Sequence, residues 1–240
     1  MKWIHDYDLF LFDFDGLLVN TEHIHFQAYK NMCDQRGIKL TWNFQEFLSF
    51  AHIGSDVLKQ AFVDQYPQLF EKEPDWQILY NEKKKAFYEL LQSAKVELMP
   101  GVGFLLKALE KENIRRAVVT NSFKEQTDLI KKKVDVLKTI PHWVTRENYY
   151  LTKPDPECYL KAIELYGKKG DRVIGFEDSS RGVQALRQTP VIAVCICSAH
   201  YPLLNMILDQ SVMYYETFDQ IPQSGPTYYT QITESTKTDS

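Results

Sequence analysis

A four-residue apolar run, Leu9 to Phe12, ends abruptly at two acids, Asp13 and Asp15, and a glycine, Gly16. A short apolar run closed by a turn signal is typical of a buried strand in a parallel sheet. Open α/β sheets bind their ligands at the carboxyl ends of such strands. Two carboxylates buried there are costly without a cation or a chemical role. Because an isolated Asp-x-Asp-Gly is more often a turn cap, the interpretation depends on the segments that follow.

The segment after this strand is helical for roughly seventy residues, which is far longer than an ordinary connection between strands. Thr21 is the expected N-cap of the first helix, and Gly37 is its expected end. Helical patterns cover residues 21–36, 43–50, 56–65 and 76–94. We therefore predict a helical cap, residues 20–93, inserted into a core formed by residues 1–19 and 94–222.

Beyond the helical segment, strand patterns alternate with helix patterns. The expected strands are residues 116–120, 143–145, 173–176 and 191–196, with a last short one at 214–215. This alternation predicts the α/β class, with a doubly wound parallel sheet covered by helices on both faces. Residues 223–240 are rich in Thr, Ser, Gly and Pro, and we predict that they form a poorly ordered tail.

Charge and composition exclude several classes of function. The formal net charge of -4 gives no reason to expect a nucleic-acid partner. Two basic runs, Lys83 to Lys85 and Lys131 to Lys133, fall in helical patterns and are interpreted as solvated faces. No apolar span suits a membrane helix, and no signal-peptide pattern opens the sequence. We expect a protein of the reducing cytoplasm with no membrane partner, a monomer with a dimer as the alternative.

Polar residues also follow three later strands. They are Thr120-Asn121-Ser122, Lys153-Pro154-Asp155 and Glu177-Asp178-Ser179. In a doubly wound sheet these strand ends face one crevice, which would gather several carboxylates, one lysine and a helix N-terminus. A hard dication such as Mg²⁺ fits among the acids, and the lysine and the threonine are left to hold an anion. This set predicts phosphoryl transfer.

The four segments together resemble the haloacid dehalogenase superfamily, in particular its phosphatases and phosphomutases with a helical cap after the first strand. Residues 12–22 are similar to the family's first motif, Val118 to Ser122 to its second, Lys153-Pro154 to its third, and Gly175 to Ser179 to its fourth. The resemblance extends from about Asp8 to Ile221. It implies a Rossmannoid core with an inserted cap, similar to the β-phosphoglucomutase and phosphoglycolate phosphatase group.

The resemblance also implies a role for each catalytic position. Asp13 would be the nucleophile and would form an aspartyl phosphate. Asp15 would protonate the leaving oxygen and then deprotonate the attacking water or hydroxyl. Lys153 would offset the negative charge that Asp13 shares with the phosphate, while Thr120 and Asn121 would bind the phosphoryl oxygens.

For the metal, the resemblance implies that Asp13, the backbone carbonyl of Asp15 and Asp178 hold Mg²⁺, with Glu177 as a possible further ligand. Ser179 and Ser180 are interpreted as turn and N-cap residues rather than catalytic groups. A carbon–halogen hydrolase is disfavoured, because halide displacement needs neither a metal nor a second acid.

These roles predict a Mg²⁺-dependent phosphatase of a small phosphorylated metabolite, with a phosphomutase or a catalytically silent binding module as alternatives. In the cap, His25 and His52 are the candidates to touch substrate, although a lone histidine on a helix, such as His25, is more often an ordinary surface or packing residue. The cap loop, residues 49–55, contains no arginine to clamp a second phosphate, which favours hydrolysis over mutase activity. Arg181 of the core is the arginine that could take that place.

Overall fold

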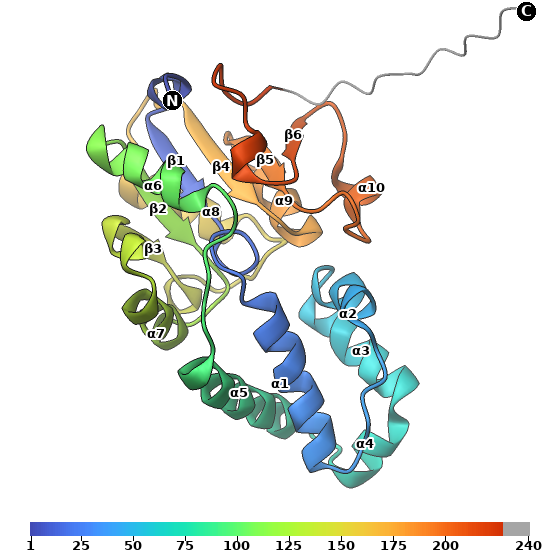
Figure 1. The fold of residues 1–240 in the computed structure, drawn as a ribbon. Helices are drawn as coiled ribbons and strands as arrows, with labels where there is room; N and C mark the ends of the chain where they lie inside the picture. The colour runs from blue at the N-terminus through green and yellow to red at the C-terminus, as the bar shows by residue number, and fades with distance from the viewer. Residues whose placement is uncertain (228–240) are drawn as a thin grey trace, which may run out of the picture.

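A computed structural model describes residues 1–227, and a six-stranded sheet forms its centre (Figure 1). The strands lie in the order β3-β2-β1-β4-β5-β6, and all neighbours pair in parallel. Their bounds are β1 Leu9–Phe12, β2 Arg115–Val119, β3 His142–Val144, β4 Val173–Glu177, β5 Ile192–Ile196 and β6 Val212–Tyr215. The doubly wound parallel sheet is therefore confirmed, and the order of the strands reverses at β1.

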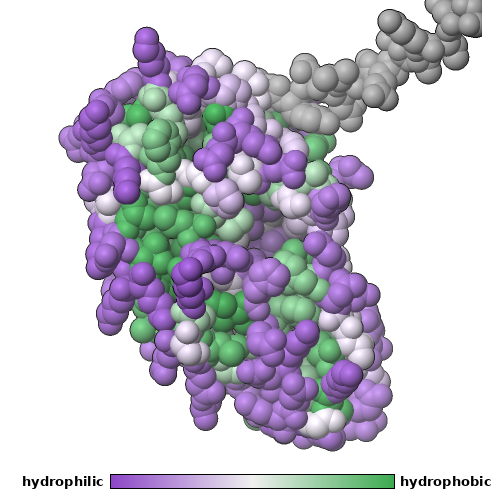
Figure 2. All heavy atoms as spheres, in the orientation of Figure 1, coloured by the Kyte–Doolittle hydropathy of each residue, from purple (hydrophilic) through white to green (hydrophobic). Residues whose placement is uncertain are grey.

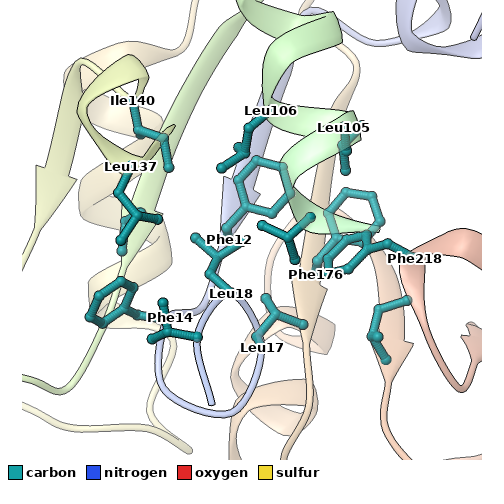
Figure 3. Packing of buried hydrophobic residues seen from close by; sticks show 14 of the residues in the cluster. Phe12, Phe14, Leu17, Leu18, Leu105, Leu106, Leu137, Ile140, Phe176 and Phe218 are labelled. Atoms are coloured by element: carbon teal, nitrogen blue, oxygen red, sulfur yellow. The ribbon is translucent and has the colours of Figure 1, made fainter. Parts of the chain in front are cut away.

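The apolar run of β1 is continuous because both of its faces are covered. Phe10 and Phe12 belong to one hydrophobic cluster, in which Phe12 stacks on Phe176 with ring centroids 5.2 Å apart. Leu9 and Leu11 point to the other face and belong to a second cluster. Figure 3 shows the first cluster beneath helix α6. A strand buried on both faces needs apolar residues at every position, which is the pattern that the sequence shows.

Helices cover both faces of the sheet. On the first face lie α6 (Val102–Lys111) and α7 (Lys124–Lys133), and on the second lie α8 (Glu157–Tyr166), α9 (Ser180–Arg187) and α10 (Leu204–Ile207). Short 3-10 turns, η1 to η4, span Trp3–Asp6, Asp135–Thr139, Arg146–Asn148 and Phe218–Gln220. No helix within residues 1–227 combines the length and the apolar character needed to cross a bilayer.

Five helices lie in the chain between β1 and α6 and form a separate lobe below the carboxyl ends of the strands (Figure 1). They are α1 Glu22–Gln35, α2 Phe44–Ala51, α3 Ser55–Gln65, α4 Pro67–Lys72 and α5 Trp76–Ser93. This helical region has its own aromatic-rich cluster, with Phe47 and Phe62 at its centre. Of these helices, α4 is not among the expected helical patterns, although Pro67 at its first position is typical of a helix start.

One local prediction holds in position only, and another is wrong. Thr21 is the N-cap residue of α1, but its side chain makes no capping hydrogen bond, and its hydroxyl donates to Asp15 at 2.5 Å. Lys83 is not on a solvated face, since it is only 5% exposed. It lies one helical turn from both Leu79 and Phe87 on the buried side of α5. The run of three lysines, Lys83 to Lys85, therefore includes one residue that faces the core.

The two connections of the helical region run side by side. The backbone N–H of Asn20 donates to the Glu97 carbonyl at 3.0 Å, and that of Met99 donates to the Leu18 carbonyl at 3.0 Å.

The first residues of the predicted tail contact the core: the Thr227 N–H donates to the Tyr215 hydroxyl at 2.8 Å. Of the predicted tail, residues 223–227 thus include a contact with the core, and residues 228–240 lie outside the described part.

Candidate active site

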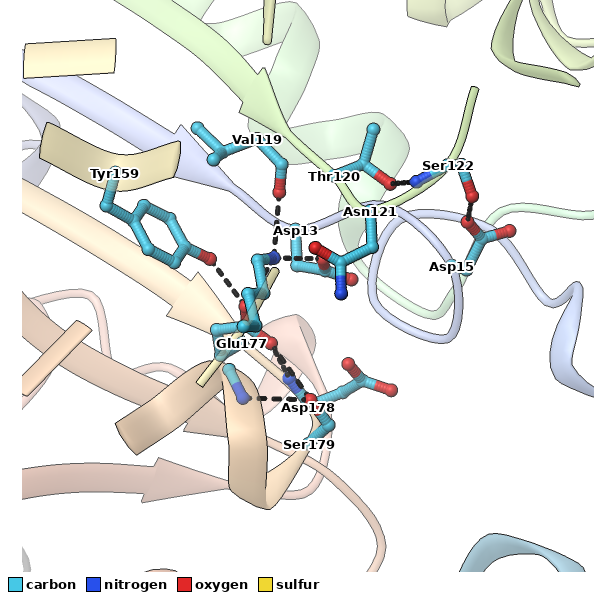
Figure 4. Close-up of polar contacts among 12 residues, drawn as sticks. Asp13, Asp15, Val119, Thr120, Asn121, Ser122, Tyr159, Glu177, Asp178 and Ser179 are labelled. Atoms are coloured by element: carbon cyan, nitrogen blue, oxygen red, sulfur yellow. Dashed lines mark hydrogen bonds and ion pairs between the residues drawn. The ribbon is translucent and has the colours of Figure 1, made fainter. Parts of the chain in front are cut away.

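A buried lysine joins two acids at the centre of the sheet edge. Asp13 follows β1, and its backbone N–H donates to the Phe176 carbonyl of β4 at 3.0 Å. The Lys153 ammonium donates to the Asp13 carboxylate, to Glu177 Oε1 at 2.7 Å and to the Val119 carbonyl at 2.8 Å. Figure 4 shows the three partners of this lysine, Asp13, Val119 and Glu177, close together. Three strand ends thus converge on one cation, as the sequence predicts.

The charges of this cluster are not balanced by the lysine alone. Burial raises the pKa of Asp13 to about 7, although Lys153 beside it works in the opposite direction. Burial, with the charges of Asp13 and Glu177, also raises the pKa of Asp178 well above its usual range. Acids with raised pKa values retain protons until a further cation replaces them. The cluster therefore has the electrostatics of a cation site.

The geometry fits a hard cation. Asp13, Glu177 and Asp178 each offer a carboxylate oxygen, and these oxygens lie within 4.8 Å of one another. The loop after β1 approaches so closely that a Cβ on Gly16 would lie 2.2 Å from Asp178 Oδ2. Gly16 also has a φ of +83°, which favours glycine. Carboxylate oxygens, together with a backbone carbonyl oxygen of the nearby loop, are ligands that suit Mg²⁺.

Within this set Glu177 differs from the two aspartates, because both of its oxygens already accept hydrogen bonds. Oε1 accepts from Lys153 and from the Tyr159 hydroxyl, the latter at 2.5 Å. Oε2 accepts from the backbone N–H of Asp178 at 3.3 Å and from the Ser179 hydroxyl at 3.4 Å. Ser179 also caps α9, as predicted, by accepting from the Gly182 N–H at 3.2 Å. The contacts of Glu177 are those of a group that orients Lys153.

Asp15 does not point into the acid cluster. Figure 4 shows its carboxylate turned toward Ser122. Four side chains hold it there: the Thr21 hydroxyl at 2.5 Å, the Ser122 hydroxyl, Gln126 Nε2 at 3.1 Å and His25 Nε2 at 3.7 Å. Burial alone would raise the pKa of Asp15, but the contacts with His25, Ser122 and Thr21 lower it below its usual value. In this arrangement Asp15 is an ionised acid held partly by the helical region.

Of the two residues that follow β2, Thr120 is buried and Asn121 is partly exposed. The Thr120 hydroxyl oxygen accepts from the Ser122 N–H at 3.0 Å. Asn121 Oδ1 accepts from the Tyr149 hydroxyl at 2.7 Å. The Asn121 amide nitrogen is thereby directed away from Tyr149, and Figure 4 shows this side chain beside Asp13. Asn121 is therefore the residue of this pair that faces the site.

A cavity of about 510 Å³ lies between the strand ends and the helical region. Of the predicted site residues it is lined by Asp13, Asp15, Asn121, Lys153 and Asp178 of the core and by His25 and His52 of the helical region. Thr120 and Glu177 lie behind this lining. In Figure 2 the molecule narrows between its two lobes, and hydrophilic side chains border the recess. The structure thus places residues distant in sequence around one chamber.

His25 of α1 is paired with Lys83, the lysine that was expected on a solvated face. Lys83 Nζ lies 2.8 Å from His25 Nδ1, and the His25 ring stacks on Phe87 at 4.1 Å between centroids. Burial and the charge of Lys83 lower the pKa of His25. Burial lowers the pKa of Lys83 to about 8. A 3.6-residue pattern of Leu79, Lys83 and Phe87 was the signal that could have found this lysine.

His52 joins the helical region to the core. Its side chain is 5% exposed, and its Nε2 lies 3.4 Å from Glu22 Oε1 while its Nδ1 lies 3.0 Å from the Tyr201 hydroxyl. Its carbonyl accepts from the Ser180 hydroxyl at 2.9 Å and from the Arg181 N–H at 3.3 Å. Burial would raise the pKa of Glu22, but the charge and hydrogen bond of His52, together with the charges of His25 and Arg181, lower it to about 2. His52 is thus a docking residue as well as a lining residue.

The chain is similar in sequence to several known proteins. Residues 10–196 match a family model described as haloacid dehalogenase-like hydrolase. The "Phosphorylated carbohydrates phosphatase" of Thermotoga maritima is 27% identical over 184 residues, which cover 75% of this chain and 81% of that protein. The "Beta-phosphoglucomutase" of Bacillus subtilis is 23% identical over 194 residues, covering 77% and 80%.

The fold is also similar to that of solved structures. CbbY from Rhodobacter sphaeroides in complex with phosphate superposes with a TM-score of 0.71 at 18% identity, covering 89% of this chain and 96% of that one. The family match spans all four polar strand ends, from Asp13 to Ser179. The resemblance drawn from those segments is thereby confirmed, and the chain belongs to the haloacid dehalogenase-like hydrolase family.

Proposed function

We propose that this enzyme is a Mg²⁺-dependent phosphatase that hydrolyses a small phosphorylated metabolite through an aspartyl phosphate on Asp13. One observation carries the proposal: Asp13, the buried Lys153 and Asp178 meet in one cavity at the end of the central strand. A carboxylate nucleophile, a fixed cation and a metal ligand are the groups that phosphoryl transfer requires. The relatives named as phosphatases support the same chemistry.

In this proposal the carboxylate oxygen of Asp13 attacks phosphorus and the ester oxygen leaves. Asp15 is ionised while His25, Ser122 and Thr21 hold it, so in this proposal it leaves those contacts and takes up a proton from solvent first. It gives that proton to the leaving oxygen and then takes one from the water that attacks the aspartyl phosphate, which releases inorganic phosphate.

Lys153, fixed by Glu177, stabilises the charge on Asp13 and on the transferring group. The amide of Asn121 and the residues around Thr120 bind the phosphoryl oxygens. The enzyme then returns to its starting state.

The magnesium site would consist of Asp13, the backbone carbonyl of Asp15 and Asp178. When bound, the cation would supply charge neutralisation to the acids and to the phosphate. Glu177 stays available as a further ligand only if it gives up contacts that it makes with Lys153, Tyr159 or Ser179. In our proposal it therefore acts mainly by positioning Lys153.

We further propose that residues 20–93 act as a cap on the core of residues 1–19 and 94–222. Asp15 is held by Thr21 and His25, which belong to the start of the cap. A movement of the cap about its two connections would release the Asp15 carboxylate toward the reacting phosphate. His25 and Lys83 would then face the substrate from the cap side.

The test is a screen of phosphorylated metabolites with purified enzyme, with Mg²⁺ and with EDTA, that follows released phosphate. Release from at least one ester that stops with EDTA supports the proposal. No turnover of any ester would instead favour a silent binding module.

The second candidate is a phosphomutase, favoured by the relatives named β-phosphoglucomutase. The cap loop counts against it, because His52 is buried and already paired with Glu22 and Tyr201. Incubation of the enzyme with β-glucose 1-phosphate and a catalytic amount of glucose 1,6-bisphosphate distinguishes a phosphatase from a phosphomutase. Formation of glucose 6-phosphate that far outruns phosphate release would identify a mutase.

A further inference from the structure

One positively charged side chain of the cavity lining, that of Arg181, makes no ion pair with another described residue. Arg181, the second residue of α9, is half-buried, lines the same cavity as Asp13, and follows Asp178 by three residues. Among residues 1–227 its guanidinium has no hydrogen bond and no ion pair within 4 Å. The other lysines and arginines of the lining are engaged: Lys153 with Asp13 and Glu177, Lys83 with His25, Lys84 with the Phe123 ring, and Arg146 with the Tyr149 carbonyl.

The charge of Arg181 faces the helical region. Burial raises the pKa of Tyr80 in α5 and of Tyr29 in α1, and the guanidinium of Arg181 opposes both shifts. The Arg181 N–H donates to the His52 carbonyl in the connection between α2 and α3 at 3.3 Å. Arg181 therefore belongs to the core by sequence but presents its charge to the cap side of the chamber.

We infer that Arg181 binds a second anionic group of the substrate, so that the enzyme acts on phosphate esters bearing a further phosphate or carboxylate. This inference rests on the proposed phosphatase activity and names the substrate class of the same site. A guanidinium presents a planar fork of donors that matches a phosphate or carboxylate in a bidentate way. The cavity of about 510 Å³ lies within the usual range for small-molecule sites, about 300–1,000 Å³, so a sugar bisphosphate fits by size.

Glu22 is the internal acid that could have satisfied Arg181. The charge of Arg181 contributes to the low pKa of Glu22, yet the two side chains form no ion pair within 4 Å. Glu22 is paired with His52 Nε2 at 3.4 Å instead. The donor fork of Arg181 is consequently left to the cavity, where a ligand can reach it. An arginine that served only to neutralise Glu22 would affect all substrates equally, and this difference gives the test.

The experiment compares two matched pairs of esters with the Mg²⁺-loaded, full-length enzyme. Glucose 1,6-bisphosphate against glucose 1-phosphate tests a second phosphate, and 6-phosphogluconate against glucose 6-phosphate tests a carboxylate. We expect wild-type kcat/KM to favour the two-anion ester at least tenfold in one pair. In Arg181→Gln, KM for that ester should rise on the order of 10- to 100-fold more than KM for its partner, the loss typical of a charge-assisted hydrogen bond. Lys107→Gln, a charge removed from the exposed face of α6, should leave the preference unchanged.

Two results would overturn the inference: wild-type enzyme without preference in either pair, or equal losses on both members of a pair in Arg181→Gln. If no ester is hydrolysed at all, the phosphatase proposal fails, and calorimetric binding of the same pairs to the enzyme still decides. Tighter binding of a two-anion ligand that Arg181→Gln abolishes supports the anion site independently of turnover. Equal affinities for both members of each pair contradict it.

Discussion

Replacing Lys153 with methionine tests whether the acid cluster is held together by this one cation. Methionine keeps the length and the apolar stem of the lysine but removes the ammonium that contacts Asp13, Glu177 and the Val119 carbonyl. The side chain of Lys153 is 2% exposed, so water cannot replace the lost charge. Leaving a buried charge without its partner costs about 3–5 kcal/mol. At about 2–4 °C per kcal/mol for a chain of this size, Tm should fall by roughly 6–20 °C.

The pH dependence of this loss has a definite sign. The pKa of Asp13 is already raised to about 7, and removal of Lys153 also removes an influence that lowers it. A carboxyl whose pKa is higher in the folded state stabilises the fold at low pH, and that stability is lost as pH rises through the folded pKa. The destabilisation of Lys153→Met should therefore be larger at pH 8 than at pH 5. Urea unfolding and calorimetry of the EDTA-treated protein at both pH values measure it.

A double-mutant cycle supplies the control. Adding Glu177→Gln to Lys153→Met removes one of the two uncompensated carboxylates, so the double variant should be less destabilised than the sum of the single variants. The exposed Lys107→Met should change stability by less than about 0.5 kcal/mol. A loss of equal size at pH 5 and pH 8, or strict additivity in the cycle, would refute the reasoning.

Four further outcomes are expected. Asp13→Asn should lose measurable turnover with an unchanged circular dichroism spectrum, and a wild-type rate would exclude it as the nucleophile. Asp15→Asn should slow turnover by about 10²–10⁴-fold while Mg²⁺ affinity, measured by calorimetry, persists, because its proposed ligand is a backbone carbonyl. Since the pKa of Lys83 is about 8, the KM of the wild type should rise between pH 7 and pH 9, and Lys83→Met should lack that rise. Small-angle scattering should show a smaller radius of gyration when a phosphate analogue closes the cap, and an unchanged profile would contradict the hinge.

The sequence predicted the parts of this fold that depend on local pattern. The continuous apolar run of β1 and the acids behind it predicted a central buried strand, and the paired ends of β2 and β4 followed the same logic. Ser179 as the cap of α9 also follows from local chemistry, because an N-cap needs only its own helix.

What the sequence could not predict depends on contacts between distant segments. Thr21 stands at the N-cap position that its residue type suggests, but its hydroxyl is turned toward the Asp15 carboxylate of the preceding loop and makes no capping bond. Lys83 lies in a run of three lysines, and only the packing of α5 decides which of them is buried. The pairing of Glu177 with Lys153 and Tyr159 likewise exists only after β4 and α8 have come together.

The side-by-side connections of the helical region have a consequence for how the chain folds while it is being synthesised. β1 leaves the ribosome first, yet its partner β2 is made about a hundred residues later, a delay of roughly 5–20 s at ~5–20 residues per second. Until β2 has been synthesised, the aromatic residues of β1, Phe10 and Phe12, cannot pack within the sheet. The helical region, complete at Ser93 and with its own cluster around Phe47 and Phe62, can pack meanwhile and bring its two ends together. The insertion thus shortens the effective loop that β1 and β2 must close.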